Sequence, residues 1–159
     1  MVKARREVRG ISAVGANLIG VERAEKAVWR SIAEGRSAAV ETVLSSPKFV
    51  PVVLAATQNG YRTRLIFVAL PSVDVSIARV RARKRMGGHG VPMRKLRVRW
   101  VRTHANLLVF LPLVDDLQVF SNANEPAIIG ERHGRDGELR ILDANAAPVV
   151  TRLLLRALT

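Results

Sequence analysis

Six consecutive apolar residues, Leu65-Ile66-Phe67-Val68-Ala69-Leu70, end a segment that begins at Arg62. A continuous run of this kind, with no polar residue at alternate positions, is typical of a strand whose two faces are both covered, as in a parallel sheet. We therefore expect Arg62–Leu70 to be a central parallel strand. Its expected neighbours in the sheet are Ala38–Leu44 and Leu117–Ser121.

Helices are predicted before, between and after these strands, from apolar residues at helical spacing and from Gly or Pro at the ends. Their ranges are about Val21–Glu34, Pro47 to Gly60, Pro71 to Met86, a long helix that ends near Pro112, and Ala146–Leu158. Between the third and fourth helices, Gly87–Pro92 is predicted to be a loop. A β-hairpin is predicted at Ala127–Arg132 and Glu138–Leu142, around the turn Gly134–Gly137. This alternation favours a single three-layer α/β domain, residues 1–159, with a mainly parallel sheet followed by the hairpin and the last helix.

The composition narrows the class of protein. The chain has 159 residues, of which 48% are hydrophobic, enough for one domain with its own core. No apolar stretch approaches the roughly 18 residues of a membrane span, and the basic N-terminus is not followed by the apolar segment of a secretory signal. The absence of cysteine excludes a disulfide scaffold and a thiol nucleophile. We expect a cytoplasmic protein without a membrane partner.

Positive charge is concentrated in one segment. Lys and Arg number 26 against 13 for Asp and Glu, a net charge of +13. Between Val75 and Val114 there is no acidic residue, whereas basic residues crowd the same segment: Arg79, Arg81, Arg83, Lys84, Arg85, Arg94, Lys95, Arg97, Arg99 and Arg102. Such a focus predicts a polyanionic partner, and the predominance of Arg suits forked contacts to phosphate oxygens.

The spacing of the arginines suggests a lid. Arg79 and Arg83 are four residues apart and so share one side of their predicted helix. The glycine loop separates them from Arg97 and Arg99 on the next helix. Two helices joined by a short flexible loop can close arginines over a bound phosphate chain. The alternative interpretation is a solvated basic hairpin.

Three linked motifs within this sequence resemble a known family. The first is Gly35-Arg36-Ser37-Ala38-Ala39-Val40-Glu41-Thr42-Val43-Leu44-Ser45. The second lies between Ile77 and Trp100 and consists of Ile77-Ala78-Arg79-Val80 with Arg83, then Gly87-Gly88-His89, then Leu96-Arg97-Val98-Arg99-Trp100. The third is Val119-Phe120-Ser121-Asn122. Together they resemble the zeta-toxin family of P-loop kinases, over about three fifths of the chain from Val28 to Asn124. The resemblance implies a nucleotide-kinase-like P-loop fold. It also implies transfer of the ATP γ-phosphate, with Mg²⁺, to a sugar hydroxyl such as that of UDP-N-acetylglucosamine, and an antitoxin protein as a candidate partner.

The resemblance also assigns roles to individual residues. Arg83 and Arg99 become lid arginines on the ATP phosphates, with Arg79 and Arg97 as their neighbours. They would neutralise charge on the transferring phosphoryl group. Glu41 and Thr42 take catalytic positions at a strand end that faces the acceptor substrate, with Ser45 and His89 as further substrate contacts. For Glu41 a local ion pair with an arginine, and for His89 a purely structural turn, are the alternatives.

The sequence departs from the family in its N-terminal part. Such kinases need Gly-x-x-x-x-Gly-Lys-Ser/Thr, and this sequence contains no Gly-Lys pair. Gly10 and Gly15 have the glycine spacing, but Ala16 and Asn17 follow them. The sequence can also be aligned to the family so that Asn17 takes the place of the family's catalytic aspartate. An amide cannot accept a proton as a carboxylate does. The P-loop strand would then precede residue 1. We expect a family member that lacks its N-terminal segment and whose kinase activity is impaired.

Other function classes have less support. The residues His89, His104 and His133 show no metal-ligand spacing with carboxylates, and no Gly-x-Ser-x-Gly elbow is present. The main alternative is a non-enzymatic basic α/β protein that binds nucleic acid or an acidic protein. The kinase hypothesis predicts basic residues that line a cleft at the carboxyl ends of the strands, and the alternative predicts an open convex basic surface.

Overall fold

The structure is a computed structural model that describes residues 13–88, 90–123 and 125–157, with side chains from residue 22 onward. The chain divides into two compact units, residues 1–41 and residues 42–159. The first unit contains helix α1, Ala13–Ala33. The predicted helix at Val21–Glu34 is therefore confirmed, although it begins earlier. Gly35 follows with a φ of +68°, a backbone conformation in which glycine carries no steric penalty.

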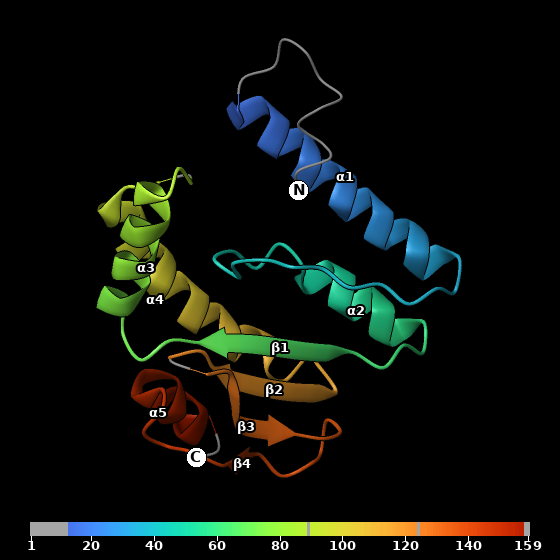
Figure 1. Cartoon of the computed structure of the whole chain (residues 1–159). Coiled ribbons are helices and arrows are strands. Elements are labelled where there is room, and N and C mark those ends of the chain that lie inside the picture. The colour runs from blue at the N-terminus through green and yellow to red at the C-terminus, as the bar shows by residue number, and fades with distance from the viewer. Residues whose placement is uncertain (1–12, 89, 124, 158–159) are drawn as a thin grey trace. The chain divides into compact units, whose positions relative to one another are not determined.

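The second unit contains the sheet and four helices (Figure 1). The elements in chain order are α2 Val50–Gln58, β1 Arg64–Ala69, α3 Val73–Arg85, α4 Met93–Phe110, β2 Asp116–Ser121, β3 Ala127–Arg132, β4 Arg140–Ile141 and α5 Pro148–Arg156. The predicted helices and the predicted hairpin are confirmed to within a few residues at each end. Within the residues that the structure describes, no helix is both long and apolar enough to cross a bilayer.

The sheet differs from the one predicted. Its order is β1-β2-β3-β4, with a parallel pairing only between β1 and β2 and antiparallel pairings for the other two. The predictions of a mainly parallel sheet and of a central position for β1 were wrong, because β2 is internal and β1 lies at the edge. The sheet is mixed, since the hairpin that follows β2 extends it in the antiparallel sense.

The predicted strand at Ala38–Leu44 is also absent, because residues 36–45 have no regular secondary structure and pair with none of the described strands. Side chains of α4 bind this segment instead. The Thr103 hydroxyl donates to the carbonyl of Val43 at 2.7 Å, and the Asn106 amide donates to the carbonyl of Leu44 at 2.8 Å. Leu44 has a φ of +51° and is buried in the core. The segment therefore packs its apolar side chain without joining the sheet.

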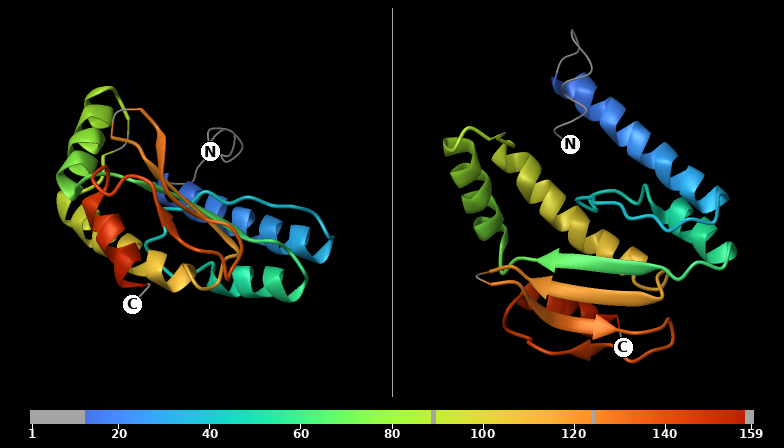
Figure 2. Two further views of the ribbon diagram at one scale, coloured as in Figure 1. Left: turned by 90° about the horizontal axis from the view of Figure 1, so that it is seen from below. Right: turned by 45° about the vertical axis from the view of Figure 1, so that its right-hand side comes forward.

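One face of the sheet carries the core. Phe67 of β1 and Val119 of β2 are paired in register and pack with Leu107 of α4 and Leu154 of α5 in a single cluster of buried side chains. Helices α2, α4 and α5 lie on this side of the sheet (Figure 2). Within the second unit the layers are therefore one sheet and one set of helices, in place of the three layers expected.

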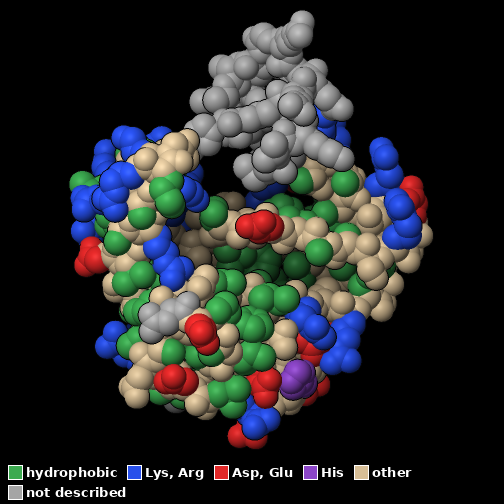
Figure 3. Space-filling model, in the orientation of Figure 1, with side chains coloured by type: hydrophobic (Ala, Val, Ile, Leu, Met, Phe, Trp, Pro, Cys, Tyr) green, Lys and Arg blue, Asp and Glu red, His purple; other side chains and the backbone are tan. Residues whose placement is uncertain are grey.

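The opposite face of the sheet carries exposed apolar side chains. Ile66 and Val68 of β1 are 56% and 57% exposed, and Ile128 of β3 is 37% exposed. Figure 3 shows apolar side chains gathered over this face. The apolar run predicted cover on both faces of β1, but only the face with Leu65, Phe67 and Ala69 has it.

The outer edge of β1 is unpaired within the described part of the chain. The carbonyl of Thr63 accepts from the amide of Asp116, and the carbonyl of Ala69 accepts from the amide of Asn122. In a strand, backbone groups point alternately to the two edges, so Ile66 and Val68 direct theirs away from β2. Among the described residues no strand pairs with that edge.

We expect this edge to make the protein self-associate, because unpaired backbone groups beside apolar side chains are a template for another strand. Val68→Lys should lower the association, since a lysine on an edge strand opposes the docking of a second strand. Sedimentation of the wild type and the variant over a range of concentrations measures the effect. Leu54→Lys, at a comparably exposed position on α2, should behave like the wild type. Equal association of all three proteins would contradict the prediction.

Candidate functional site

Helices α3 and α4 form an antiparallel pair at the carboxyl end of β1. Ser72 begins α3, and its hydroxyl accepts a hydrogen bond from the amide of Val75 at 3.3 Å. Asp74 lies in the first turn, where a carboxylate suits the helix dipole. The carboxyl edge of parallel strands is where open α/β sheets bind ligands. The most basic segment of the chain, α3 and α4, therefore follows directly from the carboxyl end of β1, at the sheet edge that suits an anionic ligand.

A glycine loop joins the two helices, as the sequence predicts. Gly87 has a φ of +81°. A Cβ atom on Gly88 would lie 2.7 Å from the Cγ of Arg83 and 2.8 Å from its carbonyl oxygen, closer than packed atoms allow. The tight turn between α3 and α4 therefore depends on glycine at both positions.

Arg79 attaches α3 to the carboxyl end of β2. Its guanidinium donates to the carbonyl of Asn122, and to that of Ala123 at 3.1 Å. Arg83 stands one turn further along the same side of α3 and is exposed. The structure therefore brings Arg79 and Arg83 together, with Arg79 held at the sheet and Arg83 directed to solvent.

Arg97 and Arg99 leave α4 in different directions. Arg97 Nη2 lies 3.4 Å from a carboxylate oxygen of Asp74, which ties α4 to the start of α3. Residues two apart on an α-helix are separated by about 200°, so Arg99 lies nearly opposite. It precedes Thr103 by one turn and shares the side of α4 that contacts Val43. No described contact joins Arg99 to Arg83, and each arginine has its own surroundings.

The predicted substrate residues lie in several places. The hydroxyl of Thr42 accepts a hydrogen bond from the amide of Leu44 at 3.2 Å and so supports the turn at that position. Ser45 lines an open hollow of about 280 Å³ beside α4. Glu41 is exposed and belongs to the first unit. His89 lies outside the described residues, as do the side chain of Asn17 and the whole of Gly10.

The helix pair is strongly positive and exposed. Every one of its ten basic side chains is exposed, and Asp74 is the only carboxylate on either helix. These guanidinium and ammonium groups could contact the phosphates of a nucleotide or of a nucleic acid. Over residues 13–88, 90–123 and 125–157, no three His, Asp or Glu side chains cluster as metal ligands.

A second charged cluster, which sequence reasoning missed, lies at the amino ends of β1 and β2. The carboxylate of Asp116 is 1% exposed and accepts two hydrogen bonds from Arg62, at 2.7 and 2.8 Å. It also accepts from the amide of Gly134 at 3.1 Å, and Arg64 lies 3.7 Å away. The hydrogen bond from Arg62 is the largest cause that lowers the pKa of Asp116 far below its usual range, and the amide of Gly134 adds to it.

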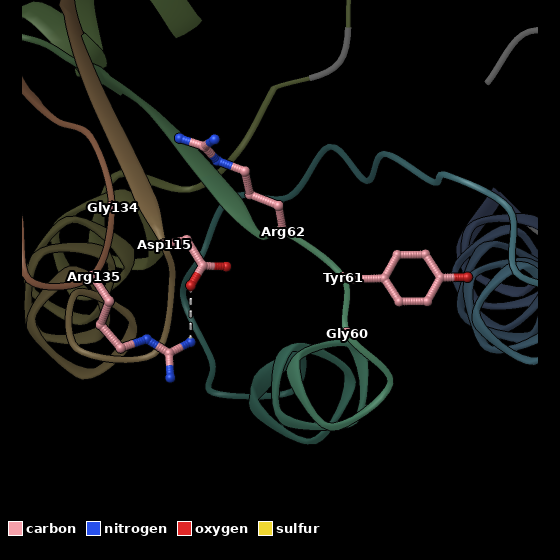
Figure 4. Close-up of a pocket in the computed structure, with 6 residues that line it drawn as sticks. All are labelled: Gly60, Tyr61, Arg62, Asp115, Gly134 and Arg135. Atoms are coloured by element: carbon pink, nitrogen blue, oxygen red, sulfur yellow. Dashed lines mark hydrogen bonds and ion pairs between the residues drawn. The ribbon is translucent and has the colours of Figure 1, made fainter.

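Asp115 completes this cluster. Its carboxylate accepts from the amide of Thr63 at 2.7 Å and from the Thr63 hydroxyl at 2.9 Å. The backbone hydrogen bond from Thr63 is the main cause that lowers the pKa of Asp115. Arg135 lies 3.2 Å from the same carboxylate. Asp115 and Arg135 line an open hollow of about 320 Å³ with Gly60 and Tyr61, in which the Tyr61 ring points away from the ion pair (Figure 4).

The Asp115–Asp116 cluster is explained as a structural ion-pair network. The carboxylates are satisfied by Arg62 and Thr63, directly before β1, and by the hairpin turn. The cluster stands at the opposite end of β1 and β2 from α3. Nearby, the buried Arg132 donates to the carbonyls of Leu111 and Val114 at 2.9 and 2.7 Å, which joins β3 to the end of α4. The sequence does contain a signal for this cluster. Asp115 and Asp116 stand directly before the predicted strand Leu117–Ser121, and Arg62 and Arg64 stand at the start of the predicted strand Arg62–Leu70.

No protein-family model, curated protein or solved structure matches this chain. The similarity to the zeta-toxin family therefore stays a prediction that is based on the motifs.

We predict that Asp116→Asn lowers the free energy of unfolding at pH 7 by about 1.5–3 kcal/mol, because it removes charge-assisted hydrogen bonds from a buried group. The folded-state pKa of Asp116 is depressed, so its stabilisation is present above the usual aspartate pKa of about 4 and is lost as the pH falls towards the folded-state pKa. Urea unfolding at pH 7 and pH 3 should show a smaller difference between the two proteins at pH 3.

Asp74→Asn is the matched control for this experiment. The Asp74 side chain is 77% exposed and has one ion pair, with Arg97, so its loss should change the free energy of unfolding by less than about 0.5 kcal/mol. A destabilisation by Asp116→Asn that stays the same at both pH values would contradict the assigned role of the Asp116 charge.

Proposed function

We propose that this chain binds the phosphate groups of a nucleotide at the carboxyl edge of β1 and β2, as part of an ATP-dependent phosphotransferase of the zeta-toxin type. The observation that carries the proposal is the path of the chain. A parallel strand, an arginine-bearing helix, a glycine turn, a second arginine-bearing helix and the neighbouring parallel strand follow one another in the order of the motifs.

Arg79 supports this proposal from the structural side. Its contacts to the carbonyls of Asn122 and Ala123 hold α3 at the end of β2. Arg83, one turn further along the same side of α3, is left exposed. In this proposal Arg83 and Arg99 grip the phosphates of ATP, Mg²⁺ accompanies the nucleotide, and the acceptor is a sugar hydroxyl such as that of UDP-N-acetylglucosamine. Thr42 and Ser45 of the second unit are proposed to face the acceptor.

Binding of ATP by this chain should depend on the lid arginines. Arg83→Ala and Arg99→Ala should each weaken binding by about 1.5–3 kcal/mol, the range for hydrogen bonds to charged groups, which is roughly tenfold or more in the dissociation constant. Titration calorimetry at low ionic strength measures this. Arg152→Ala removes a charge from an exposed position on α5 and should leave the affinity unchanged. Equal affinity in all four proteins would reject the lid role.

Phosphate transfer by the 159-residue chain should be slow or undetectable. The sequence has no Gly-Lys pair to neutralise the β and γ oxygens. On the proposed resemblance, the amide of Asn17 also stands where the family has a proton-accepting carboxylate. Phosphoryl transfer depends almost wholly on positioning and electrostatics, so these absences remove most of the catalysis. The measurement is transfer from labelled ATP to UDP-N-acetylglucosamine with Mg²⁺, beside the same chain extended by a P-loop segment. Robust transfer by the 159-residue chain would contradict the prediction.

Nucleic-acid binding is a second candidate, and the dispersal of the arginines favours it. Arg97 and Arg99 leave α4 on opposite sides, and all ten basic side chains are exposed, so the pair presents charge over a wide surface. A phosphate backbone can use such a surface without a closed cleft. Tight binding of duplex DNA with a steep loss of affinity as salt rises, together with no binding of ATP, would favour this function over the kinase.

A further inference from the structure

The side of α4 that faces away from the core is apolar. Beyond Arg94 in the first turn, its exposed residues there are Val98, Val101, Ala105 and Val109, at spacings of three, four and four. The three valines are 42%, 67% and 45% exposed. The core-facing side of the same helix carries the buried His104, Leu107 and Phe110. Helix α4 thus has an apolar stripe on each of two opposite sides.

A second stripe of this kind is unusual for the solvent side of a helix. The outer face of a surface helix is normally charged or polar, and β-branched residues there weaken the helix slightly. Apolar residues at spacings of three and four are the pattern on which another helix packs. The valine stripe, defined as Val98, Val101, Ala105 and Val109, therefore suits a helical partner.

Basic side chains border the valine stripe. Lys95, Arg97 and Arg102 stand beside it on α4 and are exposed. They correspond to the positions that flank an apolar seam between two helices, where charges select the partner. Arg102 has no ion-pair partner among the described residues, and the sequence has no carboxylate from Val75 to Val114.

A hollow adjoins the valine stripe. It measures about 280 Å³ and is lined by Ser45, Ser46 and Pro47 together with Arg102, Ala105 and Asn106. Ala105 belongs to the stripe and Arg102 to its basic border, so the two features are continuous. The wall that faces α4 is held in place by the hydrogen bonds from Thr103 and Asn106 to the preceding carbonyls.

We propose that the valine stripe and this hollow together dock an acidic amphipathic helix of a partner protein. The apolar residues of that helix pack between the valines, and its carboxylates lie against Lys95, Arg97 and Arg102. The hollow accepts a carboxylate side chain, because Arg102 lines it together with Ser45 and Ser46. Complementary charge at the border of an apolar seam adds both affinity and partner choice.

Two other occupants fit less well. A second copy of this chain would place Arg102 and Lys95 against like charges, which is unfavourable at such positions. A lipid surface is usually entered by Trp, Phe or Leu, whereas this stripe consists of valine and alanine. A flat bilayer would also leave the hollow at Arg102 unfilled.

The test uses the full chain, without nucleotide, and a fluorescent peptide of three heptads with the repeat Glu-Ile-Ala-Ala-Leu-Glu-Glu. We expect the peptide to bind in fluorescence anisotropy. Val101→Lys should weaken binding about tenfold or more, although it adds a positive charge, because it interrupts the apolar stripe. Arg102→Gln should also weaken binding about tenfold. Because nucleotide is absent, the result does not depend on the proposed function.

Matched controls separate docking from general charge attraction. Leu155→Lys places the same side chain at an exposed position on α5, and Arg152→Gln removes one charge from the same helix. Both should bind the peptide as the wild type does. Circular dichroism and thermal unfolding confirm that each variant is folded.

Three results would overturn the proposal. The first is peptide binding that Val101→Lys leaves unchanged or strengthens, because the attraction would then be electrostatic alone. The second is equal binding of a peptide in which lysine replaces every glutamate. The third is binding to vesicles of phosphatidylserine and phosphatidylcholine that is lost in Val101→Lys while the acidic peptide does not bind, which would assign the stripe to a lipid surface.

Discussion

The parallel pairing of β1 with β2 is the constraint on which the rest of the second unit depends. Its amino end is held by Asp115 and Asp116, which bind Thr63 and Arg62 across the two strands. Its carboxyl end is held by Arg79, which reaches from α3 to the end of β2. Because the two strands run in the same direction, the chain must cross over between them. That crossover is the helix pair α3 and α4.

The crossover explains why helices α3 and α4 both help to form the core and present a high density of positive charge. The core-facing side of α4 supplies Leu107 and Phe110 to the buried cluster, and contacts such as Arg97 with Asp74 join the two helices. The other sides are then free to carry arginines. The same helices that close the core thus present a dense positive surface at the strand ends, and this supports a phosphate ligand in both candidate functions.

The structure leaves two apolar surfaces exposed, and they differ in kind. The one on the sheet, around Ile66 and Val68, continues into an unpaired strand edge and suits another strand. The one on α4 is a narrow stripe with basic borders and suits another helix. Their separation means that the protein could associate with strands and with helices through independent surfaces, and that each can be removed by a single lysine substitution.

The sequence by itself determined the type and order of nearly every element, because these depend on local signals. The apolar run before Pro71, the cap at Ser72 and the glycine turn at Gly87 and Gly88 each act within a few residues. It also located the basic helix pair, since charge is read directly from composition. The tertiary structure alone decided which strand is internal, because strand order depends on contacts between distant residues.

The tertiary structure also decided whether the segment around Leu44 is a strand or a loop, and which residues bind Asp116. A short, partly β-branched segment can be a strand or a loop, and hydrogen bonds from Thr103 and Asn106 to its carbonyls hold this one as a loop. The Asp115–Asp116 network joins residues more than 50 positions apart, a distance that no local pattern spans. The sequence also placed Arg79, Arg83, Arg97 and Arg99 in one segment, but the helix geometry puts Arg97 and Arg99 on opposite sides of α4.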